Sequence, residues 1–389
     1  MSVETASRAQ IVVCDWIPPE FGAVGQYELG RAREAARAGG RVLLIGLGKE
    51  SMQERERIGA GELTIERLAA PRNPKESFVR RALWALAINR RLARATRDAQ
   101  RRSRPASIMV TGSPPLLAYW LLLQNHLFWR QRIVYRMTDF YPEVALAAGK
   151  ARWLAPSKPF FRWLRRKADS LEVLSFDMKR RLAAEGLEDR IVVKRDSSPI
   201  KDWRAAEPAV HPFKGHPVLL YSGNWGVAHE SATICEAYRR HVQEGSNRVR
   251  LWINGQGVRV GEVKAFCETH GLPLKVTPPA TLPALAGILQ VADAHLVLLD
   301  RAFWGYVFPS KTYACLEAGQ PLLYIGPAES DVHLLATRHA ETYWHAAPGD
   351  VDAALRALEE LAARPRRAIA PRRIDFQESA AANTLEAVT

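Results

Sequence analysis

The stretch FWGYVFPSKTYACLEAGQPLLYIG, residues 303–326, combines a turn, a helix and a strand. Pro309, Ser310 and Lys311 stand where the helix is expected to begin. Gly319 stands where it is expected to end, because glycine readily adopts the left-handed conformation that closes many helices. The apolar run that follows predicts a buried strand. Free backbone amides at a helix N-terminus, together with a lysine, form a binding place for phosphate groups. The stretch therefore predicts a site for a diphosphate.

Lys311 itself has two interpretations. The helix dipole places partial positive charge at the helix N-terminus and so disfavours a cation there. A bound phosphate explains the lysine better than a solvated position does, although the solvated position stays open.

Apolar strands alternate with amphipathic helices on both sides of this stretch. Such alternation predicts parallel sheets covered by helices, and 389 residues exceed the size of one ordinary domain. Prolines and polar residues in 195–217 predict a linker. We therefore predict an α/β protein with two doubly wound, Rossmann-like domains facing a central cleft, over residues 1–203 and 204–372. A C-terminal helix over 373–389 is expected to pack back on the first domain.

Two turns in the second half follow predicted strands in the same manner. Gly223, Asn224 and Gly226 come after the first of these strands, and Asn254 and Gly255 come after the next. Glycines leave backbone amides accessible to a ligand at the carboxyl edge of a parallel sheet. The repetition favours a polar ligand there over ordinary turns.

A third turn, with Gly22 and Gly25, separates the first strand from the first helix. It lacks the third glycine of the GxGxxG pattern, which argues against a nicotinamide cofactor. Its glycines would let a substrate approach the backbone closely, with an ordinary strand-to-helix turn as the alternative.

The formal charge of +14 is concentrated in two basic stretches with interleaved apolar residues, 72–104 and 151–169. Arginine-rich helices with aromatic residues suit an anionic membrane surface, whereas a solvated basic face is the alternative. Nucleic acid is not expected as a partner, because no recognition motif accompanies the charge. The predicted membrane contacts are Trp84, Trp153, Phe160, Phe161, Trp163, Arg162, Arg165 and Arg166.

The remaining composition is that of a globular protein, 47% hydrophobic and 25% charged. The sequence contains neither an apolar run long enough to span a bilayer nor a secretory signal, which predicts a cytoplasmic protein. Four cysteines without a CxxC pair predict buried, reduced thiols.

Taken together, YSGNWGVAHE, INGQG, ADAHLVLL, VFPSKTYACLEAGQPLLYIGP and PPEFGAVGQYELGRAREAARAGGRV resemble GT-B glycosyltransferases. The resemblance is greatest to bacterial sugar-nucleotide transferases that build cell-surface polysaccharides. It implies transfer of a sugar from a nucleoside diphosphate, with UDP favoured, to a polyprenyl-diphosphate-linked acceptor. The enzyme would then lie on the inner face of the plasma membrane. It also implies that Ser310 and Lys311 hold the diphosphate, with Lys311 acting in catalysis.

The same resemblance assigns the glycine turns. It implies that Gly22 and Gly25 lie on the acceptor side of the site. Gly223, Asn224 and Gly226 would lie beside the leaving phosphate, and Asn254 and Gly255 would help to form the nucleotide pocket. Many retaining GT-B enzymes carry two glutamates before the G-x-P turn. Here Tyr306 and Ala314 occupy those positions, and we include Tyr306 among the donor-binding residues.

Asp139, in the turn RMTDFYPE, is the predicted catalytic base, with Glu143 second on the acceptor side. A helix cap is the alternative role for Asp139. Because retaining relatives need no protein base, the stereochemistry stays open.

No DxD pair occurs at a strand end, so neither a metal nor another cofactor is expected. Two other functions remain possible from the sequence. One is epimerisation of a nucleotide sugar, and the other is non-catalytic binding of membrane or nucleic acid through the basic face.

Overall fold

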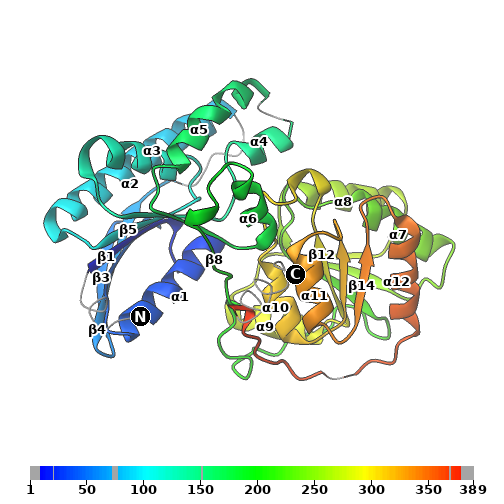
Figure 1. The fold of residues 1–389 in the computed structure, drawn as a ribbon. Coiled ribbons are helices and arrows are strands. Elements are labelled where there is room, and N and C mark those ends of the chain that lie inside the picture. Colours follow the sequence, from blue (N-terminus) through cyan, green and yellow to red (C-terminus); the bar gives the residue numbers. More distant parts are fainter. Residues whose placement is uncertain (1–8, 21, 72–77, 150–151, 368, 378–389) are drawn as a thin grey trace. The chain divides into compact units, whose positions relative to one another are not determined.

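The computed structural model describes residues 9–20, 22–71, 78–149, 152–367 and 369–377 (Figure 1). The chain divides into two compact units. The first unit comprises Met1–Leu174 and Met178–Lys194, and the second comprises Ser175–Asp177 and Arg195–Thr389. The sequence predicted this division after residue 203.

The first unit is built on one eight-stranded sheet, with strand order β3-β4-β2-β1-β5-β6-β7-β8. All neighbouring strands are parallel except β3 and β4, which form an antiparallel hairpin. The sequence did not predict this hairpin, because the edge strand β3 reads MQERERI and is largely polar. The strands are β1 (Ala9–Trp16), β2 (Arg41–Gly48), β3 (Met52–Ile58), β4 (Gly61–Ala69), β5 (Ser107–Thr111), β6 (Ile133–Met137), β7 (Ser170–Val173) and β8 (Ile191–Val193).

Helices cover both faces of this sheet. Helix α1 packs on β1, β2 and β4, whereas α2 and α3 lie on the opposite face, where α3 also contacts α5 (Figure 1). The helices are α1 (Ala23–Arg37), α2 (Phe78–Ser103), α3 (Leu117–Gln124), α4 (Glu143–Ala147), α5 (Lys158–Arg165) and α6 (Phe176–Ala183). A π-helical turn, Asn125–Trp129, extends α3, and a 3-10 turn, Arg152–Ser157, precedes α5.

The second unit contains a six-stranded, wholly parallel sheet, with order β11-β10-β9-β12-β13-β14. The chain moves outward from β9 to β11 and then returns to the other side of β9 with β12, so the strand order reverses between β9 and β12. Ligands of doubly wound sheets bind beside the carboxyl ends of strands at such a reversal. The strands are β9 (Val218–Asn224), β10 (Arg250–Gln256), β11 (Leu274–Thr277), β12 (Ala294–Leu298), β13 (Leu322–Ile325) and β14 (Tyr343–Ala346).

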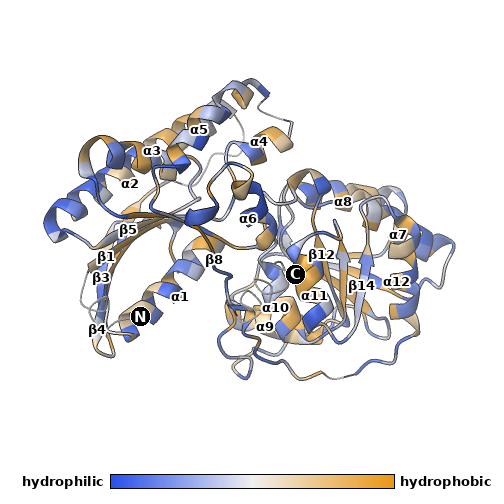
Figure 2. Ribbon diagram, viewed as in Figure 1, coloured by the Kyte–Doolittle hydropathy of each residue, from blue (hydrophilic) through white to orange (hydrophobic). Residues whose placement is uncertain are grey.

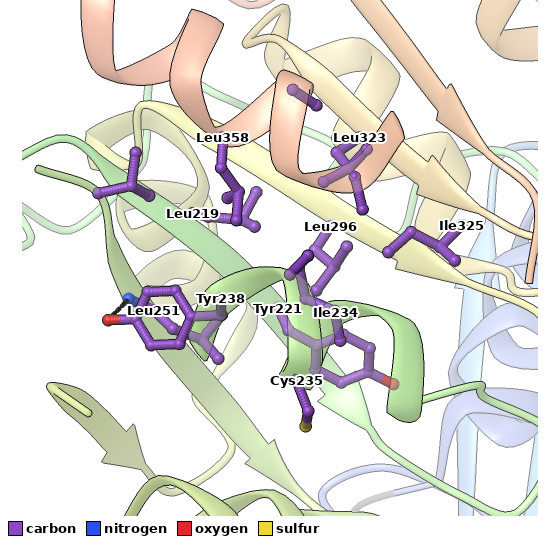
Figure 3. Packing of buried hydrophobic residues seen from close by; sticks show 14 of the residues in the cluster. Leu219, Tyr221, Ile234, Cys235, Tyr238, Leu251, Leu296, Leu323, Ile325 and Leu358 are labelled. Carbon is purple, nitrogen blue, oxygen red and sulfur yellow. Dashed lines mark hydrogen bonds between the residues drawn. The ribbon is translucent and has the colours of Figure 1, made fainter. Parts of the chain in front are cut away.

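The core of the second unit packs the inner side chains of this sheet against α7 and α12 (Figure 3). Leu219, Leu296 and Leu323 come from neighbouring strands, and Leu358 comes from α12. The helices are α7 (Ala232–Gln243), α8 (Val258–Thr269), α9 (Leu282–Val291), α10 (Lys311–Ala318), α11 (Asp331–His339) and α12 (Val351–Ala363). This core fixes β9, the strand that carries the first glycine turn.

Gly255 lies where the ends of β10 and β9 approach closely. A Cβ atom added there would lie 1.9 Å from the carbonyl oxygen of Gly223. We expect Gly255→Ala to lower the free energy of unfolding by about 1–3 kcal/mol, the usual cost of overpacking. Gly261→Ala is the control, because nothing lies within 4 Å of that position in α8. Urea unfolding of both variants measures the difference, and equal stability would contradict the close approach.

All four cysteines are buried and unpaired, as predicted. Within the described part of the chain, no helix combines the length and apolar character needed to cross a membrane. Residues 373–377, the part of the predicted C-terminal helix that the structure describes, belong to the second unit. There the ring of Phe376 contacts that of Tyr313, with 4.8 Å between the centroids. Residues 378–389 lie outside the described residues, so the predicted packing of this segment on the first domain stays a prediction.

Candidate functional site

Helix α10 runs from Lys311 to Ala318 and is capped by Gly319, whose φ of +81° is left-handed, as the sequence predicted. Ser310 precedes the helix and makes no side-chain capping bond. The Nζ atom of Lys311 is buried and has no hydrogen-bond partner among the described residues. It lies 3.3 Å from the centroid of the Tyr221 ring, in a cation–π contact. An ammonium group buried in this way leaves its hydrogen-bonding capacity for a ligand.

The carboxyl end of β9, which includes the predicted turn residues Gly223 and Asn224, lies directly beside this ammonium group. Gly223 has a φ of +124°, and a Cβ atom there would lie 3.5 Å from Lys311 Cε. The amide of Gly226 donates a hydrogen bond of 3.1 Å to Nδ1 of His229. The structure thus brings together the predicted Lys311 and two of the predicted glycines. Tyr221 and His229 were not predicted.

Burial governs the electrostatics of this cluster. It lowers the pKa of Lys311 to about 7, a shift that nearby Cys315 opposes. Burial also lowers the pKa of His229 well below its usual range, and Lys311 adds to this effect. His229 is therefore neutral. Since its Nδ1 accepts a hydrogen bond, its proton lies on Nε2, which can donate to an anion.

Other predicted donor-side residues are engaged within the unit. The side-chain nitrogen Nδ2 of Asn254 donates to Thr277 Oγ1 and to the carbonyl oxygen of Pro278, and its side-chain oxygen accepts from Ser222 Oγ. This side chain thus ties together the ends of β9, β10 and β11. Gly255 serves the close strand approach described above, whereas Asn224 is exposed at the end of β9. Tyr306 is half-buried in the loop before α10.

Glu317, the acidic residue of α10, is buried on the side that holds the C-terminal segment. Its carboxylate accepts from Trp203 Nε1 at 3.2 Å and from the Ile374 amide at 3.4 Å, and it pairs with Arg373 at 3.3 Å. These contacts explain the glutamate without a ligand.

In the first unit, Asp139 follows β6 and Asp15 is near the end of β1. Burial raises the pKa of Asp139 to about 6, and the charge of Asp15 adds to the rise. Burial also raises the pKa of Asp15 to about 6, against a hydrogen bond of 2.8 Å from Ser113 Oγ and one from the Gly25 amide. Two such carboxyl groups can hold and release a proton near neutral pH. Sequence reasoning missed Asp15.

Glu143, the second predicted base, has a different environment. It is buried, and both its oxygens accept from Nη2 of Arg165 at 2.6 and 2.7 Å. Arg165 was predicted to face a membrane. It is instead fully buried and also pairs with Glu185 at 2.6 Å. This ion pair occupies Glu143, so Asp139 is the better base.

Both glycines predicted on the acceptor side lie against the end of β1. A Cβ atom at Gly25 would lie 1.9 Å from the carbonyl oxygen of Trp16, and one at Gly22 would lie 2.7 Å from it. Their first role is therefore to let α1 start close to this strand, beside Asp15. Among the described residues, no three His, Cys, Asp or Glu side chains are grouped to hold a metal ion.

No protein family and no curated protein matches this sequence. Solved structures do match the fold. Sucrose-phosphate synthase from Thermosynechococcus elongatus superposes with a TM-score of 0.68 at 12% identity, over 91% of this chain and 90% of that one. A UDP-forming trehalose-phosphate synthase from Burkholderia xenovorans, in complex with glucose-6-phosphate, gives 0.65 at 12% identity, over 92% and 93%. Anabaena HepE, in complex with UDP and glucose, gives 0.59 at 9% identity, over 91% and 89%.

The fold is GT-B. This confirms the predicted fold class, with two bodies that each contain a parallel sheet. Within a GT-B chain, the Lys311 cluster lies at the carboxyl end of the second sheet, beside the reversal of strand order. The Asp15–Asp139 pair lies at the carboxyl end of the first sheet.

Proposed function

We propose that the protein transfers a sugar from a nucleoside diphosphate sugar to an acceptor hydroxyl. The observation that carries this proposal is the buried Nζ of Lys311, which has no hydrogen-bond partner among the described residues. Burial of an ammonium group without a polar partner costs free energy. The carboxyl edge of a doubly wound sheet is where the diphosphate of a nucleotide ligand binds, so a diphosphate would supply the missing partner. The second unit therefore binds the donor in this proposal.

The chemistry follows from the residues around the two sheet ends. The acceptor hydroxyl attacks the anomeric carbon, the bond to the diphosphate oxygen breaks, and the nucleoside diphosphate leaves with the bonding electrons. Protonated Lys311, the Nε2 proton of His229 and Ser310 would stabilise the charge that develops on the leaving group. In an inverting reaction Asp139 would take the hydroxyl proton, whereas in a retaining reaction the leaving phosphate would take it.

UDP is the proposed nucleotide. Structures with this fold include one with UDP and glucose bound and several UDP-forming synthases. A lipid-linked acceptor, polysaccharide biosynthesis and attachment to the inner face of the membrane belong to the same proposal. Their support is the basic, aromatic character of the first unit.

A second candidate acceptor is a soluble sugar phosphate. The trehalose-phosphate synthases of the same fold, one of them in complex with glucose-6-phosphate, favour it. Transfer assays with glucose-6-phosphate and with a polyprenyl-diphosphate saccharide distinguish the two acceptors.

Ligand titration tests the donor site. We expect UDP to bind in calorimetry and to raise the melting temperature, since a ligand of the folded state stabilises it. ADP and GDP are the controls for the base, and inorganic phosphate is the control for simple anion binding. Incubation with a UDP-sugar alone tests epimerisation, which would yield an isomerised donor. Failure of every nucleoside diphosphate to bind would overturn the proposed function.

A further inference from the structure

One side of the first unit exposes large apolar side chains that its core does not use. Five of them define what we call the aromatic surface, and they come from the π-helical turn after α3, the 3-10 turn before α5, and α5 itself. Their exposed fractions are 56% for Leu127, 75% for Phe128, 69% for Trp153, 49% for Phe160 and 37% for Trp163.

Contacts between rings join these segments into one surface. The rings of His126 and Trp163 lie 5.4 Å apart and connect the π-helical turn to α5. Phe160 stacks on Trp163 at 5.9 Å, and the 3-10 turn that carries Trp153 packs against α5. Ring contacts thus join the π-helical turn to α5, and the 3-10 turn with Trp153 lies directly beside α5, although β6 and α4 separate it from the π-helical turn in the chain.

Helix α5 already has an inner side that packs on the unit. Phe161 contacts the Tyr119 ring at 4.7 Å, and Leu164 is buried. Phe160 and Trp163 are exposed instead. The ribbon of α5 accordingly shows both hydrophobic and hydrophilic residues along its length (Figure 2). Of the predicted membrane contacts, Phe161 therefore belongs to the packed side. Trp84 is half-buried and donates to the Pro71 carbonyl oxygen at 2.8 Å.

The charge of these segments has one sign. Residues 125–132 and 152–167 contain no Asp or Glu but many Arg and Lys. Arg152, Arg162 and Arg166 are exposed, and the ammonium group of Lys167 lies 4.9 Å from the centroid of the Trp163 ring. Of the nearby carboxylates, that of Glu143 pairs with Arg165, and that of Glu185 pairs with Arg165 at 2.6 Å and with Arg162 at 3.4 Å. A partner that binds the aromatic surface must therefore offer apolar groups to the rings and anionic groups to the arginines beside them.

Helix α2 carries a similar combination on the same side of the sheet. Leu83 and Leu86 are exposed at 61% and 52%, and Arg90, Arg91 and Arg94 are exposed along the same helix. Helix α3 packs against both α2 and α5. Residues 72–77, which begin the basic stretch 72–104, lie outside the described residues.

We propose that the aromatic surface docks on an anionic lipid bilayer. Aromatic side chains settle at the headgroup level, and cations beside them attract anionic headgroups. A second copy of this chain is disfavoured as the occupant, because each copy carries a net charge of +14. This inference deepens the proposed function by naming the surface that would bring the enzyme to a lipid-linked acceptor. It is nevertheless measurable without sugar transfer.

Vesicle cosedimentation of the full chain tests the docking. The probes are vesicles of phosphatidylcholine with and without phosphatidylglycerol. We expect binding only with the anionic lipid, and weaker binding as salt rises. The double variant Phe128→Ser/Phe160→Ser should bind about tenfold or more weakly, since two exposed rings no longer enter the headgroup region. Val210→Ser, at an 83% exposed position of the second unit, is the matched control and should bind like the parent chain.

Three results would contradict the proposed docking surface. Equal binding to both kinds of vesicle, or unchanged binding by the double variant, would overturn the docking surface. So would a concentration-dependent dimer in gel filtration that the double variant abolishes without any vesicle binding, because the occupant would then be a second copy. UDP titration of the same samples keeps the two proposals separate. Intact UDP binding without vesicle binding would defeat only the docking surface.

Discussion

Lys311→Met should abolish detectable UDP binding and lower the rate of sugar transfer by about 10²–10³, the usual loss when one preorganised charge-stabilising group is removed. Methionine has nearly the same length and shape but no charge. Because the Nζ of Lys311 is buried without a hydrogen-bond partner among the described residues, its replacement by an apolar group should not destabilise the fold. The measurements are UDP titration, UDP release from the donor, and the melting temperature.

The pH dependence of UDP affinity tests whether UDP binding depends on the positive charge of Lys311. In the free protein the pKa of Lys311 lies at about 7, whereas the diphosphate prefers the protonated form. Above pH 7 binding must take up a proton, so the affinity should fall as pH rises from 7.5 to about 9, where the phosphate is already fully ionised. Lys311→Arg should lose this slope, since arginine stays protonated. A melting temperature that collapses in Lys311→Met, or an unchanged affinity, would contradict the assignment.

Asp139→Asn should lower kcat by about 10²–10⁴, the usual contribution of a general base. The UDP affinity should not change, because Asp139 and Lys311 belong to different units. The carboxylate must be ionised to accept a proton. With its pKa at about 6, the rate should fall below pH 6 by about tenfold per pH unit. The measurement is UDP release over a range of pH with the acceptor identified by the transfer assays.

Asp15→Asn provides the matched comparison. The charge of Asp15 contributes to the raised pKa of Asp139, so its removal should shift the acidic limb of the rate profile to lower pH. A merely structural role for Asp15 would lower activity without this shift. If Asp139→Asn keeps full activity, then the base assignment fails and a retaining reaction, with the leaving phosphate as base, is favoured.

The sequence predicted those elements whose pattern is local. Helix α10 with its glycine cap, and β9 with its apolar run, could be recognised because each depends on neighbouring residues. The edge strand β3 was missed because only one side of it packs, so polar residues replace the apolar ones. Likewise, Tyr221 and His229 became candidates only through their positions beside Lys311, far along the chain, and no local motif encodes such a contact.

The role of polar residues was harder to predict than their position. The sequence predicted Asn254 in a glycine turn after a strand, which is typical of a ligand contact. It instead lies within β10, where its side chain bonds Thr277 and Pro278 at the end of the adjacent strand. Arg165 lies in a basic, aromatic helix but pairs with Glu143 and Glu185, which come from separate segments. In both cases the competing partner is distant in sequence, so a linear pattern contains no sign of it.

Glu317 connects α10 to two segments that are distant in the chain, so this helix has a structural role in addition to its proposed role in donor binding. The helix that starts with the proposed donor lysine also anchors Trp203 of the linker and Arg373 near the end of the described chain. The backbone amide of Arg372 is bonded to Glu317 as well, at 2.8 Å to its carbonyl oxygen. Residues 372–374 thus hold α10 in place through Glu317. Shortened versions of the chain that stop before Arg372 would leave a buried carboxylate without its cation, so a truncation intended only to remove a tail would also disturb the helix that carries Lys311.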